Sequence, residues 1–443
     1  MKNIQTNQYF YRSILEKLKK WIDRKEIFII KGPRQSGKTT ILKILKDWLI
    51  SEKNVKEKNI IFITFEERDI LDKFSLDPKE YIKSFIGNKN NEKLYFFIDE
   101  FQYLKNSGQI LKMLYDIFEN IKFIITGSSS LELTDKTDKF LVGRVFSFYL
   151  WQLNFEEFVK IKSEQLYNVY KEKTTHINNF IIHNKNFSFA KKDIFESDFE
   201  KLFQEYIIYG GYPEVVKSYD RETKKVILKN IYNTYITKDI IELLKITDYS
   251  KFKILVSILS AQIGNIINYN NLSQDTQIYF KELKRYLSIL EETYIISFLT
   301  PFFTNKISEL KKNPKIYFID IGLRNYISSM LDDNIISRSD LGAIVENTIF
   351  CQLKLKEKEE DLYLVKYWRT SGRAEIDFIL QKSKQMIPIE VKYSLFNSPK
   401  ISRGFRNFIK EYKPEKALVL TKNYYDEIKI NSTLVKFAPL WYL

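Results

Sequence analysis

The sequence predicts a multidomain α/β protein, and three observations support this fold class. The chain has 443 residues, whereas a domain usually holds roughly 100–200. Short apolar runs alternate with helical stretches near the N-terminus, which is typical of a parallel sheet covered on both faces by helices. A helix followed by several strands is expected again beyond residue 335, after a mostly helical middle.

The N-terminal segment, residues 1–155, supplies the parallel sheet. An amphipathic helix is expected over 9–24 and a second helix over 39–50. Four apolar runs are each short enough to be buried strands, and they cover 27–32, 59–65, 94–100 and 122–128.

Three further segments follow along the chain. Residues 156–222 are expected to hold a helix and an exposed Asn/Lys-rich insertion (174–193), before the turn GGYPEVV. Residues 223–332 are mostly helical, and their order of helix, link, helix, helix and strand suits a winged-helix module. Residues 333–443 form a second α/β domain, which begins with a helix over 340–356.

Composition narrows the class of protein. Hydrophobic residues make up 44% of the chain and charged residues 29%, which is a globular mixture. The formal charge of +15 favours a polyanionic partner, or it reflects a lysine-rich composition alone. A single cysteine, Cys351, excludes an internal disulfide, and we expect His176 and His183 to be solvated rather than metal ligands. Without a long apolar run, we expect a soluble cytoplasmic protein with no membrane partner.

A phosphate-binding motif lies between the first strand and the next helix. The pattern G-x-x-x-x-G-K-[ST] needs a strand before it and a helix after it, and both are expected here. Main-chain N–H groups of such a loop wrap phosphate oxygens, so we predict an ATP site with Mg²⁺. Lys38 would reach the β- and γ-phosphates and the Thr39 hydroxyl would ligate Mg²⁺. The predicted nucleotide-binding residues are Gly32, Pro33, Arg34, Gln35, Ser36, Gly37, Lys38, Thr39 and Thr40.

Polar residues that complete this site are expected at the ends of later strands. Asp99 would hold Mg²⁺, and Glu100 would position or deprotonate the attacking water. In the Ser-rich stretch after the fourth strand, Ser128 is the first choice for a contact with the γ-phosphate, unless the stretch is only a turn. Arg144 would stabilise developing charge in its own subunit or in a neighbour, or it forms a structural salt bridge.

A second acidic set lies in the C-terminal domain. Glu390 and Lys392 are two residues apart, so in a strand they face the same side. Asp377 and Glu390 could share a second Mg²⁺ or a Mn²⁺ while Lys392 orients water, and Glu346 would complete the cluster. The pattern resembles the PD-(D/E)xK core of restriction-endonuclease-like domains. An ordinary strand with a solvated polar face is the alternative.

Basic residues in the middle segment suggest contact with DNA. Lys281, Lys284, Arg285 and Tyr286 lie on one expected helix, which could enter a DNA groove or be a solvated basic face. The stretch Lys311-Lys312-Asn313-Pro314-Lys315 resembles a wing tip, or equally a charged turn.

Together these motifs resemble one family of prokaryotic AAA-superfamily ATPases. The likeness rests on GPRQSGKTT, FIDEFQYL, ITGSSS, LVGRVFSFYLWQLNFEEF, GGYPEVV, YNTYITKDI, PKIYFIDIGLRN, GAIVEN and the WRT…EIDFIL…IPIEVKYS block. It implies an ATPase core, a helical and winged-helix-like middle, and a nuclease-like end of unknown function. The chain departs from the family at 151–154, WQLN, where a proline and a serine are expected.

Three functional hypotheses follow. The first is an AAA-type ATPase that binds or acts on DNA, whose C-terminal domain is a metal-dependent nuclease, a DNA-binding relic or a protein-contact domain. The second is a signalling NTPase switch whose catalytically silent C-terminal domain binds protein partners. The third is an ATP-driven protein remodeller, ranked lower because no pore loop is recognisable. Assembly into a homo-oligomer is compatible with each.

Overall fold

The computed structural model describes residues 9–87, 92–127, 141–183, 185–187, 193–241, 246, 248–303, 312–331, 334–360, 363–370, 372 and 374–443. The chain divides into two compact units. The first comprises Met1–Gln152 with Glu292–Tyr294, and the second comprises Leu153–Glu291 with Ile295–Leu443. Within the described ranges, every helix is too short or too polar to pass through a lipid bilayer.

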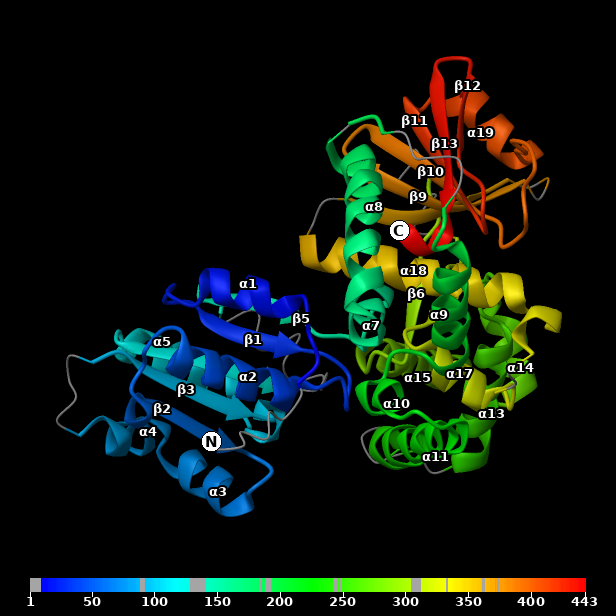
Figure 1. The fold of residues 1–443 in the computed structure, drawn as a ribbon. Coiled ribbons are helices and arrows are strands. Elements are labelled where there is room, and N and C mark those ends of the chain that lie inside the picture. The colour runs from blue at the N-terminus through cyan, green and yellow to red at the C-terminus, as the bar shows by residue number, and fades with distance from the viewer. Residues whose placement is uncertain are drawn as a thin grey trace. The chain divides into compact units, whose positions relative to one another are not determined.

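The first unit is built on a five-stranded parallel sheet of order β2-β3-β4-β1-β5 (Figure 1). Because all strands are parallel, their carboxyl ends meet at one edge. The strand of the phosphate-binding motif, β1, is separated from the acidic strand β3 by β4. The strands are β1 (Ile27–Lys31), β2 (Ile60–Thr64), β3 (Leu94–Asp99), β4 (Ile121–Gly127) and β5 (Val145–Tyr149).

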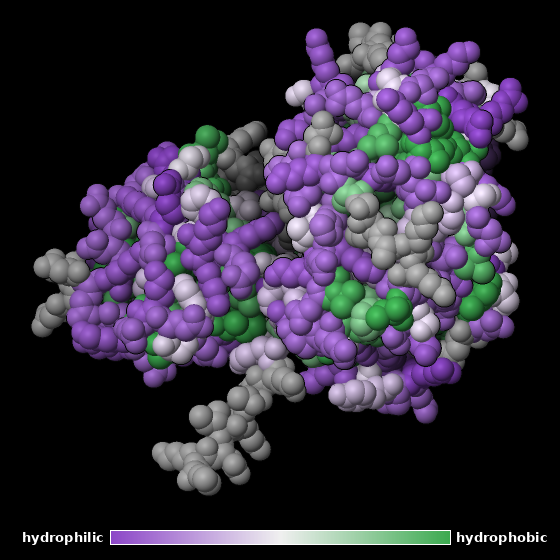
Figure 2. All heavy atoms as spheres, turned by 45° about the horizontal axis from the view of Figure 1, so that its top comes forward, coloured by the Kyte–Doolittle hydropathy of each residue, from purple (hydrophilic) through white to green (hydrophobic). Residues whose placement is uncertain are grey.

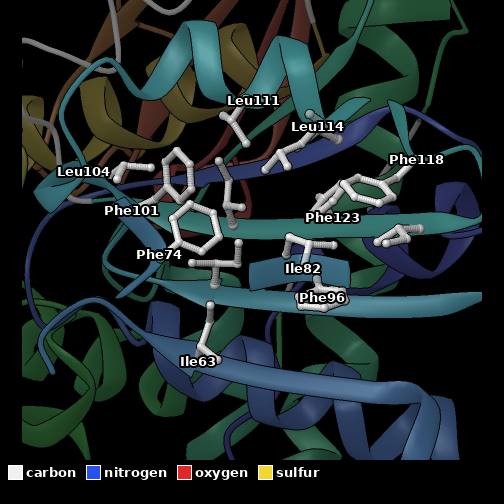
Figure 3. Packing of buried hydrophobic residues seen from close by; sticks show 14 of the residues in the cluster. Ile63, Phe74, Ile82, Phe96, Phe101, Leu104, Leu111, Leu114, Phe118 and Phe123 are labelled. Atoms are coloured by element: carbon white, nitrogen blue, oxygen red, sulfur yellow. The ribbon is translucent and has the colours of Figure 1, made fainter. Parts of the chain in front are cut away.

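Helices cover both faces of this sheet. Alternate strand residues point to opposite sides, so each strand contributes apolar side chains to both cores. On one face, Phe28 and Ile30 pack with residues of α1 and α2. On the other, Phe96 and Phe123 lie beside Leu111 and Leu114 of α5 (Figure 3). The helices of the unit are α1 (Ile14–Trp21), α2 (Lys38–Ser51), α3 (Arg68–Leu76), α4 (Pro78–Ile86) and α5 (Ser107–Ile117), with short turns η1 (Glu57–Asn59) and η2 (Phe101–Tyr103).

The second unit begins with helices and a short hairpin. A π-helical segment follows α11, and three helices (α13 to α15) precede the antiparallel pair β6–β7. These elements are α7 (Phe155–Lys162), α8 (Glu164–His183), α9 (Glu196–Tyr209), α10 (Pro213–Lys217), α11 (Arg221–Ile231), η3 (Tyr232–Ile240), α13 (Tyr249–Ala261), α14 (Tyr269–Thr276), α15 (Phe280–Glu292), β6 (Ile296–Leu299), β7 (Lys315–Phe318), α17 (Ile321–Ile327) and η4 (Ile335–Ser337).

A mixed six-stranded sheet completes the second unit, in the order β12-β13-β11-β10-β9-β8. The strands β10, β11 and β13 run parallel to one another, whereas β8, β9 and β12 pair antiparallel. The elements are α18 (Leu341–Glu360), β8 (Leu364–Arg369), β9 (Glu375–Lys382), β10 (Gln385–Val391), α19 (Arg403–Tyr412), β11 (Lys416–Thr421), β12 (Asp426–Ile430), β13 (Thr433–Pro439) and η5 (Leu440–Tyr442). The chain is thus a mixed α/β protein with a parallel sheet, a helical middle and a C-terminal sheet domain.

Two details differ from the sequence-based expectation. The exposed insertion expected over 174–193 is wrong in its first half, because α8 continues to His183 and buries Thr174, Ile177 and Ile181 at helical spacing. The edge strand β5 was not expected, and its residues are only half buried. His176 and His183 are exposed, as expected.

The turn GGYPEVV is held by the start of α17. Buried Asp320 accepts hydrogen bonds from the N–H groups of Gly211 and Leu323, both at 2.8 Å. The amide of Asn325 donates to the last carbonyl groups of α9, those of Ile207 and Ile208. Burial raises the pKa of Asp320 to about 6, although its main-chain donors favour the charged form. The Asp320 carboxylate therefore joins the turn to α17, and the Asn325 amide joins α17 to α9.

We expect Asp320→Asn to destabilise the chain by about 1–3 kcal/mol, because the amide NH₂ faces a main-chain N–H that then lacks an acceptor. The matched control is Asp220→Asn, because Asp220 caps the exposed start of α11 and accepts the N–H of Thr223 at 2.7 Å. Asparagine caps a helix as well as aspartate does, so the control should be close to neutral. Urea unfolding at pH 7.5 makes the comparison, and equal losses in the two variants would contradict the role assigned to Asp320.

Candidate nucleotide site

The loop between β1 and α2 is a tight cradle that needs glycine at two positions. A Cβ atom on Gly32 would lie 2.0 Å from the carbonyl oxygen of Leu150, so no side chain fits there. Gly37 has φ +93°, in the left-handed region, and directly precedes the first turn of α2. Glycine at these two positions lets the loop pack closely against Leu150 and enter α2 in a left-handed conformation. The N-terminus of this 14-residue helix, a favourable position for an anion, follows directly.

A buried arginine from the N-terminal segment fixes this loop. The guanidinium of Arg12 donates to the carbonyl oxygen of Ser36 at 2.7 Å and to that of Trp151 at 2.6 Å. It thus ties the loop to the segment that follows β5, where the sequence departs from the family pattern. Sequence reasoning missed Arg12 because it belongs to no local motif.

Lys38 places its charge within the loop. It is buried, and its ammonium donates to the carbonyl oxygens of Gly32 at 3.1 Å and Pro33 at 2.9 Å. Burial lowers the pKa of Lys38, while the nearby carboxylates of Glu100 and Asp99 favour the charged form.

The ends of three elements meet at the carboxylate of Asp99. The Thr39 hydroxyl donates to Asp99 Oδ2 at 2.6 Å. The Thr126 hydroxyl, at the end of β4, donates to Asp99 Oδ1 and accepts the N–H of Glu100 at 3.1 Å. A hydroxyl and a carboxylate are the oxygen ligands that Mg²⁺ prefers, so Thr39 and Asp99 fit a magnesium ion bound together with ATP.

Glu100 turns the chain sharply away from β3. Its φ of 55° is left-handed, which is uncommon for a residue with a side chain and often accompanies a functional site. The side-chain amide of Gln102 donates to Glu100 Oε2, which orients the carboxylate. Both the main chain and the side chain of Glu100 are therefore held by hydrogen bonds.

The structure brings most predicted nucleotide-site residues to one edge of the sheet. Thr40 is exposed on the first turn of α2, and Ser128 lies outside the described residues. Thr126 takes the strand-end position for which sequence reasoning chose Ser128. Glu66, after β2, was also missed; burial and the charges of Glu100 and Asp99 raise the pKa of its carboxyl group. The residues at this edge are Gly32, Pro33, Arg34, Gln35, Ser36, Gly37, Lys38, Thr39, Asp99 and Glu100.

The prediction that Arg144 contacts the nucleotide of its own subunit is wrong. Its carbonyl oxygen accepts the N–H of Ile27, so it lies at the amino end of β1, whereas the loop follows the carboxyl end. The five residues of β1 separate the two by roughly 15 Å. Arg144 forms an ion pair with Asp116 at 3.0 Å, which is the structural alternative. Action on a neighbouring subunit stays a prediction.

The four residues of the C-terminal set also lie close together. The N–H of Val391 donates to Asp377 at 2.7 Å, and Lys392 contacts Glu390 at 3.2 Å. Burial and the charge of Glu346 raise the pKa of Asp377 to about 7, against the attraction of Lys392. Among the described residues, however, no group of three or more His, Cys, Asp or Glu side chains is arranged to hold a metal.

The basic residues predicted to meet DNA separate into two groups. Lys281, Lys284 and Arg285 are exposed on α15. Tyr286 is buried against the core and donates to Glu282 at 2.5 Å, so its placement on a DNA-facing surface is wrong. Lys315 is buried, because it lies in β7 rather than at a wing tip. Of the remaining stretch, Lys311 lies outside the described residues.

Comparison with protein families agrees with this geometry. A family model described as "AAA domain" matches residues 24–159. Two models described as domains of unknown function, DUF8612 and DUF4143, match residues 200–334 and 341–443.

Full-length relatives have no described activity. An uncharacterized protein of Haemophilus influenzae is 25% identical, with 97% of each chain covered. An uncharacterized protein of Methanocaldococcus jannaschii is 27% identical over 94% of this chain and 87% of its own. Among solved structures, the Aeropyrum pernix ORC1 protein in complex with DNA is 10% identical, covers 73% of this chain and 93% of its own, and has a TM-score of 0.30. That likeness is too loose to bear on function. The family match and the loop geometry together support a P-loop ATPase of the AAA type in residues 24–159.

Proposed function

We propose that the chain hydrolyses ATP at the carboxyl edge of its parallel sheet and uses the cycle to act on DNA in the cytoplasm. The observation that carries the ATPase part is the hydrogen-bonded set of Thr39, Asp99 and Thr126 beside the phosphate-binding loop. These bonds link the start of α2 to the carboxyl ends of β3 and β4, so the three elements meet at the Asp99 carboxylate.

Each residue of the site has a distinct part in hydrolysis. Main-chain N–H groups of the loop and Lys38 bind the phosphates. Mg²⁺, bound with ATP through Thr39 and Asp99, supplies positive charge that offsets the charge of the phosphates. Glu100 accepts a hydrogen bond from the attacking water and orients it. Thr126 fixes Asp99 through its hydroxyl proton and Glu100 through its oxygen, so both acids keep their relative positions.

The exposed cations on α15 support the DNA part of the proposal. Lys281, Lys284 and Arg285 occupy little more than one helical turn, and the chain has a net charge of +15. Three helices followed by the β6–β7 pair suit a winged-helix module, in which the third helix enters the DNA groove. Figure 2 shows a face on which hydrophilic side chains prevail and hydrophobic ones form separate patches.

Two functions are candidates for the C-terminal domain. A metal-dependent nuclease, with a second Mg²⁺ or a Mn²⁺, is favoured by the approach of Asp377, Glu390 and Lys392. The alternative is a signalling NTPase switch whose silent C-terminal domain binds a protein partner, and the absence of a metal-holding group among the described residues favours it. In a homo-oligomer, Arg144 would act on the nucleotide of the neighbouring subunit.

For the ATPase, we expect Glu100→Gln to keep ATP binding and to lower kcat by at least about 100-fold, because only the group that orients water is changed. Lys38→Ala should instead lose ATP binding itself. Equilibrium dialysis with labelled ATP and a phosphate-release assay separate the two effects. Glu119→Gln, an exposed change just before the amino end of β4, is the control and should behave like the parent. Turnover by Glu100→Gln at the parent rate would show that the assigned role is wrong.

Thr126→Val keeps the side-chain shape but removes both hydrogen bonds of the hydroxyl. We expect kcat to fall by roughly 10-fold and the Mg²⁺ requirement to rise, because a lost bond to a charged group costs about 1.5–3 kcal/mol. Thr126→Ser keeps the hydroxyl and should retain most activity. Phosphate release measured across a Mg²⁺ series decides between them, and identical profiles for the two variants would exclude a part for the hydroxyl.

For DNA, we expect the triple change Lys281→Ala, Lys284→Ala and Arg285→Ala to weaken binding and to lower the salt dependence by up to about three counterions. The control removes three exposed charges from α19 instead, through Arg403→Ala, Arg406→Ala and Lys410→Ala. Fluorescence anisotropy with a duplex at several salt concentrations gives both quantities. An equal loss in the two triple variants would mean that net charge, not α15, binds the DNA.

A further inference from the structure

The C-terminal acidic cluster already contains a cation. The ammonium of Lys315, on β7, lies 3.0 Å from Glu346 Oε1 and 2.5 Å from Glu375 Oε1. The Lys315 side chain is only 2% exposed, so this pair of contacts is shielded from water. Glu346 belongs to α18 and Glu375 to β9, and the lysine therefore comes from a different part of the chain than the acids.

The strand that carries Lys315 is fixed in place beside the cluster. Tyr317, two residues further along β7, donates its hydroxyl to the same Glu346 oxygen at 2.5 Å. The Tyr367 hydroxyl of β8 donates to the carbonyl oxygen of Asn313 at 2.7 Å, and the Lys315 ammonium lies 5.6 Å from the Tyr367 ring centre. Alternate residues of β7 thus enter the cluster together, as the period of a strand requires.

Three of the four acids of the cluster have a cation beside them, whereas Asp377 accepts the N–H of Val391. Glu390 pairs with Lys392 at 3.2 Å, and Glu375 also pairs with Arg369 at 3.4 Å. Burial alone would lower the pKa of Lys315, but the carboxylates of Glu346 and Glu375 outweigh it and raise that pKa. A divalent ion that used Glu346 or Glu375 would have to displace a buried ammonium that already contacts both carboxylates.

We propose that Lys315 is the resident cation of this cluster, so that the native chain takes no divalent metal there and the cluster instead holds the β6–β7 hairpin on the C-terminal sheet. A nuclease-like set of residues is then kept silent by a lysine from the preceding part of the same chain. The C-terminal domain would then lack metal-dependent nuclease activity, whether or not the chain hydrolyses ATP.

Mn²⁺ binding by the full chain tests the proposal directly. The Asp99→Asn variant is used without nucleotide, so that the nucleotide site takes no metal, and bound Mn²⁺ is measured by electron paramagnetic resonance. We expect less than 0.1 Mn²⁺ per chain at about 100 μM free ion, whereas a functional two-carboxylate metal site would be mostly filled. One Mn²⁺ per chain that disappears in the Asp99→Asn, Asp377→Asn double variant would overturn the proposal.

A second measurement tests the structural part of the proposal. Lys315→Met leaves buried carboxylates without their cation, so we expect the unfolding midpoint at pH 8 to fall by about 5 °C or more. Lys312→Met, at an exposed position just before β7, is the control. A Lys315→Met chain with the parent's midpoint at pH 8 would contradict the proposal.

Discussion

The carboxylate of Asp99 is the constraint on which the nucleotide site depends. It accepts hydroxyl hydrogen bonds from Thr39 on α2 and from Thr126 on β4, and it ends β3 itself. Since β4 lies between β1 and β3, this one side chain fixes the spacing of the loop and the acidic strand across an intervening strand. Because the Thr126 hydroxyl donates its only proton to Asp99, its oxygen is left to accept the N–H of Glu100. The position of Glu100 therefore follows from that of Asp99.

Much of the fold was predictable because burial leaves a local trace in the sequence. Strands β1, β3 and β4 lie inside continuous apolar runs, since they are buried on both faces. Strand β5 leaves a weaker trace, because it lies at the sheet edge and is half exposed. The helix α8 was cut short in the prediction because polar Thr and Asn residues interrupt its apolar face, and only contacts with distant segments show that Thr174 is buried.

Site residues that belong to a short sequence motif were predictable. Residues that reach the site from a distant part of the sequence were not. Lys38 and Asp99 each belong to a short motif with a fixed position relative to a strand. Arg12 reaches Ser36 across 24 residues, and Lys315 reaches Glu346 across 31, so no spacing rule identifies either. Arg144 illustrates the opposite error: proximity to a motif along the chain suggested a contact, but parallel strands put it at the far edge of the sheet.

The net charge of +15 is not all available to a partner at the surface of the chain. Several lysines counted in the +15 are buried and have internal acceptors, as Lys315 does. Lys224 pairs with Glu205 at 2.6 Å, and Lys416 donates to the carbonyl oxygen of Phe180 at 2.5 Å. Burial lowers the pKa of Lys122 to about 7, so near neutral pH this residue carries only part of a charge. An affinity of the chain for a polyanion would thus depend on exposed cations that lie together, as on α15, and the overall composition would overstate it.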